Sequence, residues 1–234
     1  MSLVKLEDVR KVYQTGGVVT EALKGIDVEI NKGTFVSFIG PSGSGKTTLL
    51  NLIGCLDKPT SGKILINDME VGQLDRKDAA NFRGNNIGFI FQNFNLLPVL
   101  TVYENVEYPL IMVQNVPKNE RKERILTLLE KVGMLDQKDK YPNQISGGQM
   151  QRVAVARAIV TSPKLVLADE PTANLDHAAA YKVIEIMHNM KSQFGTTFIF
   201  ATHDSKIVGE AEIIYALEDG LIVDSKIQNS KEKN

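Results

Sequence analysis

The pattern in this chain with the clearest chemical meaning is a glycine-rich segment that ends in lysine and threonine, GPSGSGKT at residues 40–47. It follows the apolar stretch 35–39 and opens a stretch, 45–56, with the apolar spacing of a helix. Glycines in such a loop let backbone N–H groups converge on phosphate oxygens, and the helix start adds partial positive charge. The lysine reaches the β and γ phosphates, and the threonine hydroxyl binds Mg²⁺. The segment therefore predicts a nucleoside triphosphate site rather than a flexible surface loop. Its assigned residues are Gly40, Ser42, Gly43, Ser44, Gly45, Lys46, Thr47 and Thr48.

A phosphate loop alone fits a kinase, a GTPase or an ATPase. A second pattern, KLVLADE at residues 164–170, is an apolar strand that ends in two acids. Ligands collect at the carboxyl ends of parallel strands, so Asp169 suits Mg²⁺ and Glu170 suits a nearby water. Taken by itself, such a pair is equally typical of turn or helix-capping residues. The phosphate loop favours the catalytic interpretation.

The segment SGGQMQR at residues 146–152 resembles the signature motif of ATP-binding-cassette (ABC) ATPases, and it precedes the acidic strand as it does in that family. Its hydroxyl, small residues and helix start predict a second anion site at Ser146, Gly147, Gly148 and Gln149. The same residues also make an ordinary helix N-cap. In the family, two cassettes pack head to tail, so that each ATP lies between one chain's phosphate loop and the other's signature.

The resemblance assigns further residues. Gln92 resembles the glutamine that touches Mg²⁺ and the attacking water, and the loop after it contacts the membrane subunit in the family. Asp176 belongs to a loop, 174–176, that resembles the one crossing the dimer interface, and His203 resembles the switch histidine at the γ-phosphate. Tyr13 resembles the aromatic residue that stacks on adenine, although an aromatic side chain near a strand end is more often a packing residue.

The resemblance thus implies three groups of residues. The catalytic group is Lys46, Gln92, Glu170 and His203; the metal group is Thr47, Gln92 and Asp169; the nucleotide group adds Tyr13, the signature residues and Asp176 to the phosphate loop. The implied ligands are ATP and Mg²⁺.

Small departures from the family pattern remove no catalytic group. Ile145 stands where leucine usually precedes the signature serine, Met150 where a polar residue is common, and His177 where a small residue often follows the interface loop. Whether His177 adjusts the dimer contacts or is a surface residue stays open. Segments 54–62, 87–98 and 105–110 look most like the lipoprotein-release and macrolide-export group.

The elements that must position these residues alternate. We expect strands at 3–9, 22–30, 34–39, 63–66, 87–91, 165–169 and 197–202 and helices at 45–56, 101–112, 118–132, 148–160 and 178–194. A short helix should follow the strand at 197–202, before a hairpin around 219–220. This order predicts an α/β fold with a parallel core sheet. The resemblance implies a phosphate-loop NTPase cassette of RecA-like type, with an antiparallel β subdomain and a helical subdomain inserted at about 95–160. We expect one ABC ATPase domain over residues 1–228 and a polar tail at 229–234.

Charge, cysteine count and the lengths of the apolar runs limit the partners and the cellular location that we expect for this chain. The 234 residues contain 27 Lys and Arg against 28 Asp and Glu with no long basic block, which argues against nucleic acid as a partner. One cysteine cannot form an internal disulfide, the N-terminal residues lack the apolar run of a signal peptide, and no apolar stretch approaches the roughly 20 residues of a membrane span. We expect a peripheral protein on the cytoplasmic face of the cell membrane.

The resulting hypothesis is an ATPase subunit that powers a separate transmembrane permease for export, extrusion or lipoprotein release, working with a second copy of itself. The alternative is an ABC ATPase with a non-transport task, such as mechanical signalling in cell division or iron–sulfur cluster assembly. A third class, a module that binds nucleotide without hydrolysing it, is disfavoured because Lys46, Asp169, Glu170 and His203 are all present.

Overall fold

The computed structural model describes residues 1–228, and the chain divides into two compact units. The first unit combines residues 1–80 with the chain from residue 197 onward, and the second contains residues 81–196. The polar tail expected at 229–234 lies outside the described residues.

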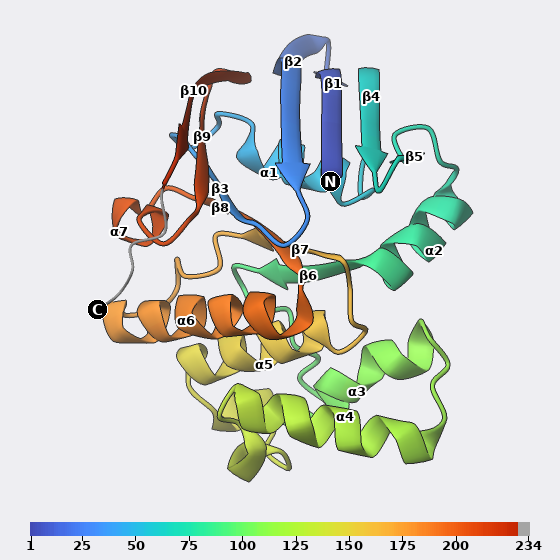
Figure 1. The fold of residues 1–234 in the computed structure, drawn as a ribbon, viewed down its shortest axis with the longest axis vertical. Coiled ribbons are helices and arrows are strands. Elements are labelled where there is room, and N and C mark those ends of the chain that lie inside the picture. Colours follow the sequence, from blue (N-terminus) through green and yellow to red (C-terminus); the bar gives the residue numbers. More distant parts are fainter. Residues whose placement is uncertain (229–234) are drawn as a thin grey trace. The chain divides into compact units, whose positions relative to one another are not determined.

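An antiparallel sheet forms one part of the first unit (Figure 1). Its strands lie in the order β2-β1-β4-β5, with bounds β1 Ser2–Thr15, β2 Val18–Asn31, β4 Ser61–Ile66 and β5 Met69–Glu70. β1 runs beyond the expected strand at 3–9 because its backbone stays paired with β2 as far as Thr15 opposite Val18. The outer half of this hairpin carries mostly exposed side chains, so no buried face marks it in the sequence.

A second set of strands in the first unit is parallel at its centre. β3 (Phe35–Ile39) pairs in parallel with β8 (Thr197–Thr202) and β9 (Ile213–Glu218), and β9 returns through a hairpin to β10 (Leu221–Ile227). All of β8 and nearly all of β3 are buried, as expected for strands covered on both faces. Phe35 packs against Phe198 and Phe200, with ring centroids 5.6 and 5.0 Å away. The helices of this unit are α1 (Lys46–Ile53) and α7 (Ser205–Val208).

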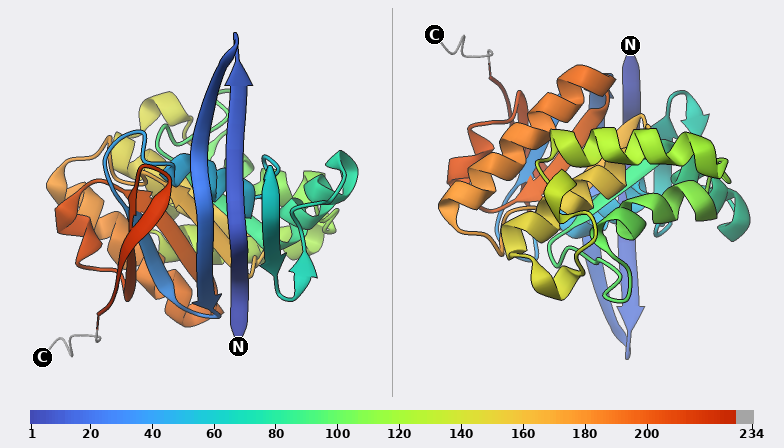
Figure 2. Two further views of the ribbon diagram at one scale, coloured as in Figure 1. Left: turned by 90° about the horizontal axis from the view of Figure 1, so that it is seen from above. Right: turned by 90° about the horizontal axis from the view of Figure 1, so that it is seen from below.

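The second unit is mainly helical. β6 (Ile87–Phe91) and β7 (Leu165–Asp169) form a parallel pair, and α5 (Gly147–Ile159) packs on β6. Figure 2 shows α3, α4 and α5 side by side, in agreement with their contacts. The remaining bounds are α3 Val102–Met112, α4 Lys118–Lys131, α6 His177–Phe194, and two short 3-10 turns at Leu135–Gln137 and Pro142–Gln144.

The strands and helices expected from the sequence are present, and one further helix was not expected. α2 (Arg76–Asn86) crosses the boundary between the two units and has no buried residue. Without a buried stripe it lacks the apolar periodicity by which a helix is recognised. Among residues 1–228, no helix is both long enough and apolar enough to cross a bilayer.

Candidate functional site

The phosphate loop leaves the carboxyl end of β3 and turns into α1. Gly40 has φ 151°, and a Cβ there would lie 2.0 Å from the Leu217 carbonyl oxygen, so only glycine fits. Gly45 is the N-cap of α1 with φ 105°, and no side chain caps the helix start. Gly45 thus gives the start of α1 no side-chain cap, the arrangement that suits a bound phosphate group.

Lys46 supplies the positive charge of this loop. Its side chain is buried, and Nζ donates to the carbonyl oxygens of Gly40 at 2.7 Å and Pro41 at 2.9 Å. None of the ion pairs among the described residues includes Lys46. Ser44 Oγ is buried in the same loop and, within residues 1–228, has no hydrogen-bond partner. A buried cation without a carboxylate beside an unsatisfied hydroxyl fits an anionic ligand.

His203 lies beside this loop within the first unit. β3 and β8 pair with Ile39 opposite Thr202, so Gly40 and His203 follow the two strands at the same edge. The His203 side chain is exposed, and the next residue, Asp204, donates its N–H to Thr202 Oγ1 at 3.1 Å. The parallel register therefore brings the phosphate loop and the predicted switch histidine to one sheet edge.

In the second unit, the register of two parallel strands likewise brings Gln92 and the acidic pair, Asp169 and Glu170, together. In the β6–β7 pair Phe91 lies opposite Asp169, so Gln92 and Glu170 are the next residues along their strands. Glu170 has φ 46°, a left-handed conformation that is uncommon outside glycine. Such a conformation is more frequent at functional sites than elsewhere.

The signature segment forms the start of α5. Ser146 is the N-cap: its Oγ accepts from the Gln149 N–H at 3.3 Å, and Gln149 Oε1 accepts from the Ser146 N–H at 2.8 Å. This capping box leaves the Ser146 hydroxyl proton available to a further acceptor. Asp176 is the N-cap of α6, with Oδ1 accepting from the Ala179 N–H at 2.9 Å.

These two helix starts face one cavity of about 280 Å³. Its lining includes Ser146, Gly147, Gly148, Asn174, Asp176 and the basic residues Arg152 and Lys182. The signature and the interface loop, assigned separately from the sequence, are therefore adjacent within the second unit.

Two side chains hold the loop after Gln92: Asn174 of the interface loop, whose role here was not predicted, and Arg157, which sequence reasoning did not assign. Asn174 Nδ2 donates to the Gln92 carbonyl at 3.1 Å and to Asn93 Oδ1 at 3.0 Å. Arg157, on α5, donates to the carbonyl oxygens of Phe94 and Asn95 at 2.8 and 2.5 Å, and burial lowers its pKa to about 10. Phe94 and Asn95 both have positive φ. The loop's shape thus depends on hydrogen bonds from distant parts of the sequence.

Tyr13 lies on β1 in the first unit and is 38% exposed. The first unit therefore contains Tyr13, the phosphate loop and His203, and the second contains Gln92, Asp169, Glu170, the signature segment and Asp176.

Comparison with known proteins agrees with these motifs. Residues 23–173 match the family described as ABC transporter. The chain is 43% identical over 221 residues to the lipoprotein-releasing system ATP-binding protein LolD 1 of Rhodopseudomonas palustris, covering 94% of this chain and 98% of that protein. It is also 43% identical over 223 residues to the macrolide export ATP-binding/permease protein MacB of Syntrophobacter fumaroxidans, covering 95% of this chain and 31% of that protein.

A solved structure extends the agreement to the fold. The ATP-binding cassette MJ0796 of Methanocaldococcus jannaschii, solved as a dimer in a post-hydrolysis state with ADP and Pi, is 41% identical. The TM-score is 0.89, and the match covers 97% of this chain and 100% of that one.

Proposed function

The chain belongs to the ABC transporter family as an ATP-binding cassette, and from this premise we propose that it hydrolyses ATP with Mg²⁺ to drive a separate transmembrane permease. The observation that carries the proposal is the pair of anion-binding helix starts, one with a buried lysine at α1 and one with a serine cap at α5. We also propose that residues 1–228 form one ABC ATPase domain with a helical insertion at about 95–160.

The proposed metal ligands are Thr47, Gln92 and Asp169. A hydroxyl, an amide oxygen and a carboxylate are the hard oxygen donors that Mg²⁺ takes, and Asp169 ends its strand opposite the residue before Gln92. Within residues 1–228 no cluster of three or more His, Cys, Asp or Glu offers a competing metal site. When bound, Mg²⁺ neutralises charge on the β and γ phosphates.

The chain's own residues supply the remaining chemistry. Lys46 exchanges its two carbonyl acceptors for β- and γ-phosphate oxygens, gaining charge-assisted hydrogen bonds. Glu170 accepts a hydrogen bond from the attacking water and directs it in line with the γ-phosphate. His203, at the same sheet edge as the phosphate loop, donates to the γ-phosphate as charge builds up on it.

We propose further that the working form is a head-to-tail dimer with two bound ATP molecules. A γ-phosphate held on Lys46 of one copy adds contacts to Ser146 and Gly148 of a second copy, so ATP favours the closed form over the open one. The dimeric MJ0796 structure supports this assembly. Hydrolysis removes the γ-phosphate contact, and the closed form loses its advantage.

The membrane assignment is supported by the relatives and by an exposed apolar surface on the second unit. Val99 and Met112 are 79% and 63% exposed, and Tyr108, Ile111 and Val113 are also exposed. Contiguous exposed apolar groups mark interaction sites, and Tyr108, Ile111 and Met112 lie at helical spacing on one face of α3. We propose that this surface receives the permease on the cytoplasmic face of the membrane.

Purification of the chain from its own cell's membranes in mild detergent tests the transport assignment. The expected result is that a membrane protein with a large extracytoplasmic domain co-purifies and raises the rate of ATP hydrolysis. Recovery of soluble assembly proteins alone would leave the ATPase chemistry intact but would favour the iron–sulfur or other non-transport alternative.

A further inference from the structure

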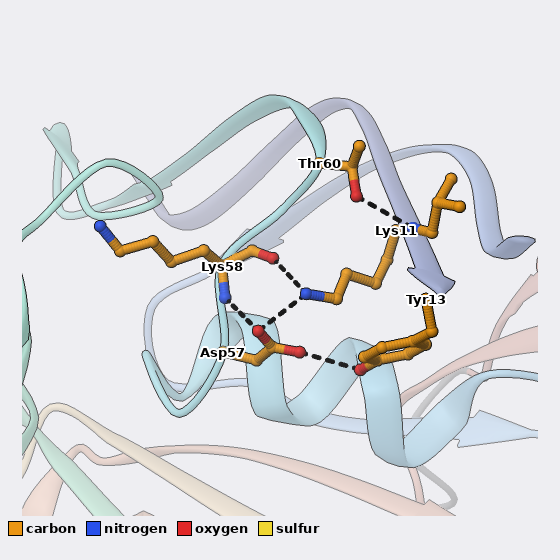
Figure 3. Close-up of polar contacts among 6 residues, drawn as sticks. Lys11, Tyr13, Asp57, Lys58 and Thr60 are labelled. Atoms are coloured by element: carbon orange, nitrogen blue, oxygen red, sulfur yellow. Dashed lines mark hydrogen bonds and ion pairs between the residues drawn. The ribbon is translucent and has the colours of Figure 1, made fainter. Parts of the chain in front are cut away.

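A side-chain cluster in the first unit surrounds Tyr13 (Figure 3). The Tyr13 hydroxyl donates to Asp57 Oδ2 at 2.9 Å. The other oxygen of the same carboxylate, Oδ1, accepts from Lys11 Nζ at 2.7 Å and from the Lys58 N–H at 2.7 Å. Lys11 Nζ also donates to the Lys58 carbonyl at 2.8 Å. Each polar side-chain group at the centre of the cluster therefore makes at least one hydrogen bond.

The cluster fixes the Tyr13 ring from two sides. The hydroxyl bond restricts rotation at the far end of the side chain, and Lys11 Nζ lies over one ring face, 4.7 Å from the centroid. Lys11 and Tyr13 are two residues apart on β1, so their side chains lie on the same face of the strand. Tyr13 is still 38% exposed, so part of the ring not covered by Lys11 can meet a flat ligand.

The charges of the cluster suit a fixed arrangement at neutral pH. Burial by itself would raise the pKa of Asp57, but the hydrogen bonds from Lys11, the Lys58 backbone and Tyr13 outweigh burial and lower it. Burial and the bond to Asp57 raise the pKa of Tyr13, against the effect of a hydrogen bond with Thr48. Asp57 therefore stays an acceptor and Tyr13 a donor throughout the physiological range.

The position of Asp57 links Tyr13 to the phosphate loop. Asp57 follows the end of α1, and its backbone N–H donates to the Asn51 carbonyl of that helix at 3.3 Å. The other end of α1 begins at Lys46. The phosphate loop thus leads into the start of α1, and Asp57, which accepts a hydrogen bond from the Tyr13 hydroxyl, follows the end of the same helix.

We propose that Lys11 and Asp57 are positioning residues that hold Tyr13 as a preformed platform for the base of the nucleotide. This inference rests on the proposed binding of ATP at the phosphate loop and identifies what favours a purine base over bare phosphates. A ring that is already immobilised loses less side-chain freedom on binding than a mobile one. The alternative explanation is a structural tie between β1 and the end of α1 with no effect on the base.

Inorganic tripolyphosphate distinguishes the two explanations because it presents the phosphates without the base. The experiment measures binding of ATP and of tripolyphosphate, each with Mg²⁺, to the full chain by calorimetry. Tyr13→Ala is expected to weaken the binding of ATP about tenfold, because it removes the stacking surface. Asp57→Asn and Tyr13→Phe are each expected to weaken the binding of ATP about threefold and to leave the binding of tripolyphosphate unchanged. Asp136→Asn, an exposed acid outside the cluster, serves as the matched control.

The double variant Tyr13→Phe with Asp57→Asn sharpens the test. If Asp57 acts through the tyrosine hydroxyl, the double variant loses no more ATP affinity than either single variant. Equal losses for ATP and tripolyphosphate in Asp57→Asn would indicate the structural tie and overturn the proposal. An unchanged ATP affinity in Tyr13→Ala would place the base elsewhere and also overturn it, while tripolyphosphate binding would still support the phosphate loop. Failure of the wild-type chain to bind either ligand would instead contradict the proposed function itself.

Discussion

The starts of α1 and α5 are both suited to anions, yet they are built in opposite ways. At α1 the N-cap is a glycine with no capping side chain, and a buried lysine lies against the loop. At α5 the N-cap is Ser146, which closes a capping box with Gln149, and no lysine or arginine lies within the first turn. The start of α1 is therefore suited to a triphosphate by itself, whereas we propose that the start of α5 adds contacts to a phosphate that is already bound.

The start of α6 completes the comparison within the second unit. Asp176 caps it with a carboxylate, so a negative charge already occupies the helix end. Ser146 and Asp176 line the same cavity, and we propose that a phosphate contacts the Ser146 cap rather than the Asp176 carboxylate. This difference predicts how variants at the helix starts should behave.

The largest expected effect comes from the lysine at α1. Lys46→Met removes the charge-assisted hydrogen bonds proposed between Nζ and the β- and γ-phosphate oxygens. We therefore expect ATP affinity to fall at least about 100-fold in calorimetry. Lys77→Met, which removes an exposed lysine of α2, should bind ATP normally. An ATP affinity unchanged in Lys46→Met would mean that α1 does not bind the phosphates.

The next effect separates capping from anion binding at α5. Ser146→Ala should destabilise the fold by about 1 kcal/mol through loss of the cap, whereas Ser146→Asp keeps a good cap and recovers this stability. Both variants should bind ATP as single chains, but Ser146→Asp should block ATP-dependent dimer formation because a carboxylate repels the γ-phosphate. Thermal unfolding and sedimentation velocity measure the two effects. A Ser146→Asp chain that still dimerises with ATP would argue against a phosphate at this helix start.

The smallest effect is expected at Gly147. Its φ is not positive, and a Cβ there would meet Phe94 Cζ at 3.5 Å, an ordinary contact. Gly147→Ala should therefore raise stability by up to about 1 kcal/mol from helix propensity while narrowing the cavity. At Gly148 the new Cβ would lie 3.0 Å from Ala179 Cβ, so the same change there should gain less. Gly147→Ala and Gly148→Ala chains that unfold at the same temperature and both dimerise like the wild type would contradict this prediction.

Most of the fold could be predicted from the sequence because its buried parts carry a repeated pattern. β8 is buried at every position and has a continuous apolar run at its centre, residues 198–201, and α6 buries residues at helical spacing. α2 has no buried residue and the outer part of the β1–β2 hairpin is mostly exposed, so neither carries the apolar pattern from which an element is predicted.

The candidate site shows the same division. Glycine, lysine and acidic residues at fixed spacing identify a phosphate loop and an acidic strand end, because the chemistry requires those types. The residues that hold them are chosen by tertiary contact: Asp57 meets Tyr13 from 44 positions away, and Arg157 meets Phe94 from 63. Lys11 alone had a local signal, since it lies two positions before Tyr13 on one strand.

The central claim, that two chains enclose ATP and Glu170 then enables its hydrolysis, is tested most directly by Glu170→Gln. Glutamine keeps the size of the side chain but is a weaker acceptor for the attacking water, so ATP with Mg²⁺ should convert this variant to a stable dimer in sedimentation velocity, with phosphate release close to zero. Glu130→Gln, an exposed change on α4, should hydrolyse ATP like the wild type. A Glu170→Gln chain that releases phosphate at the wild-type rate and remains a monomer with ATP would contradict the account.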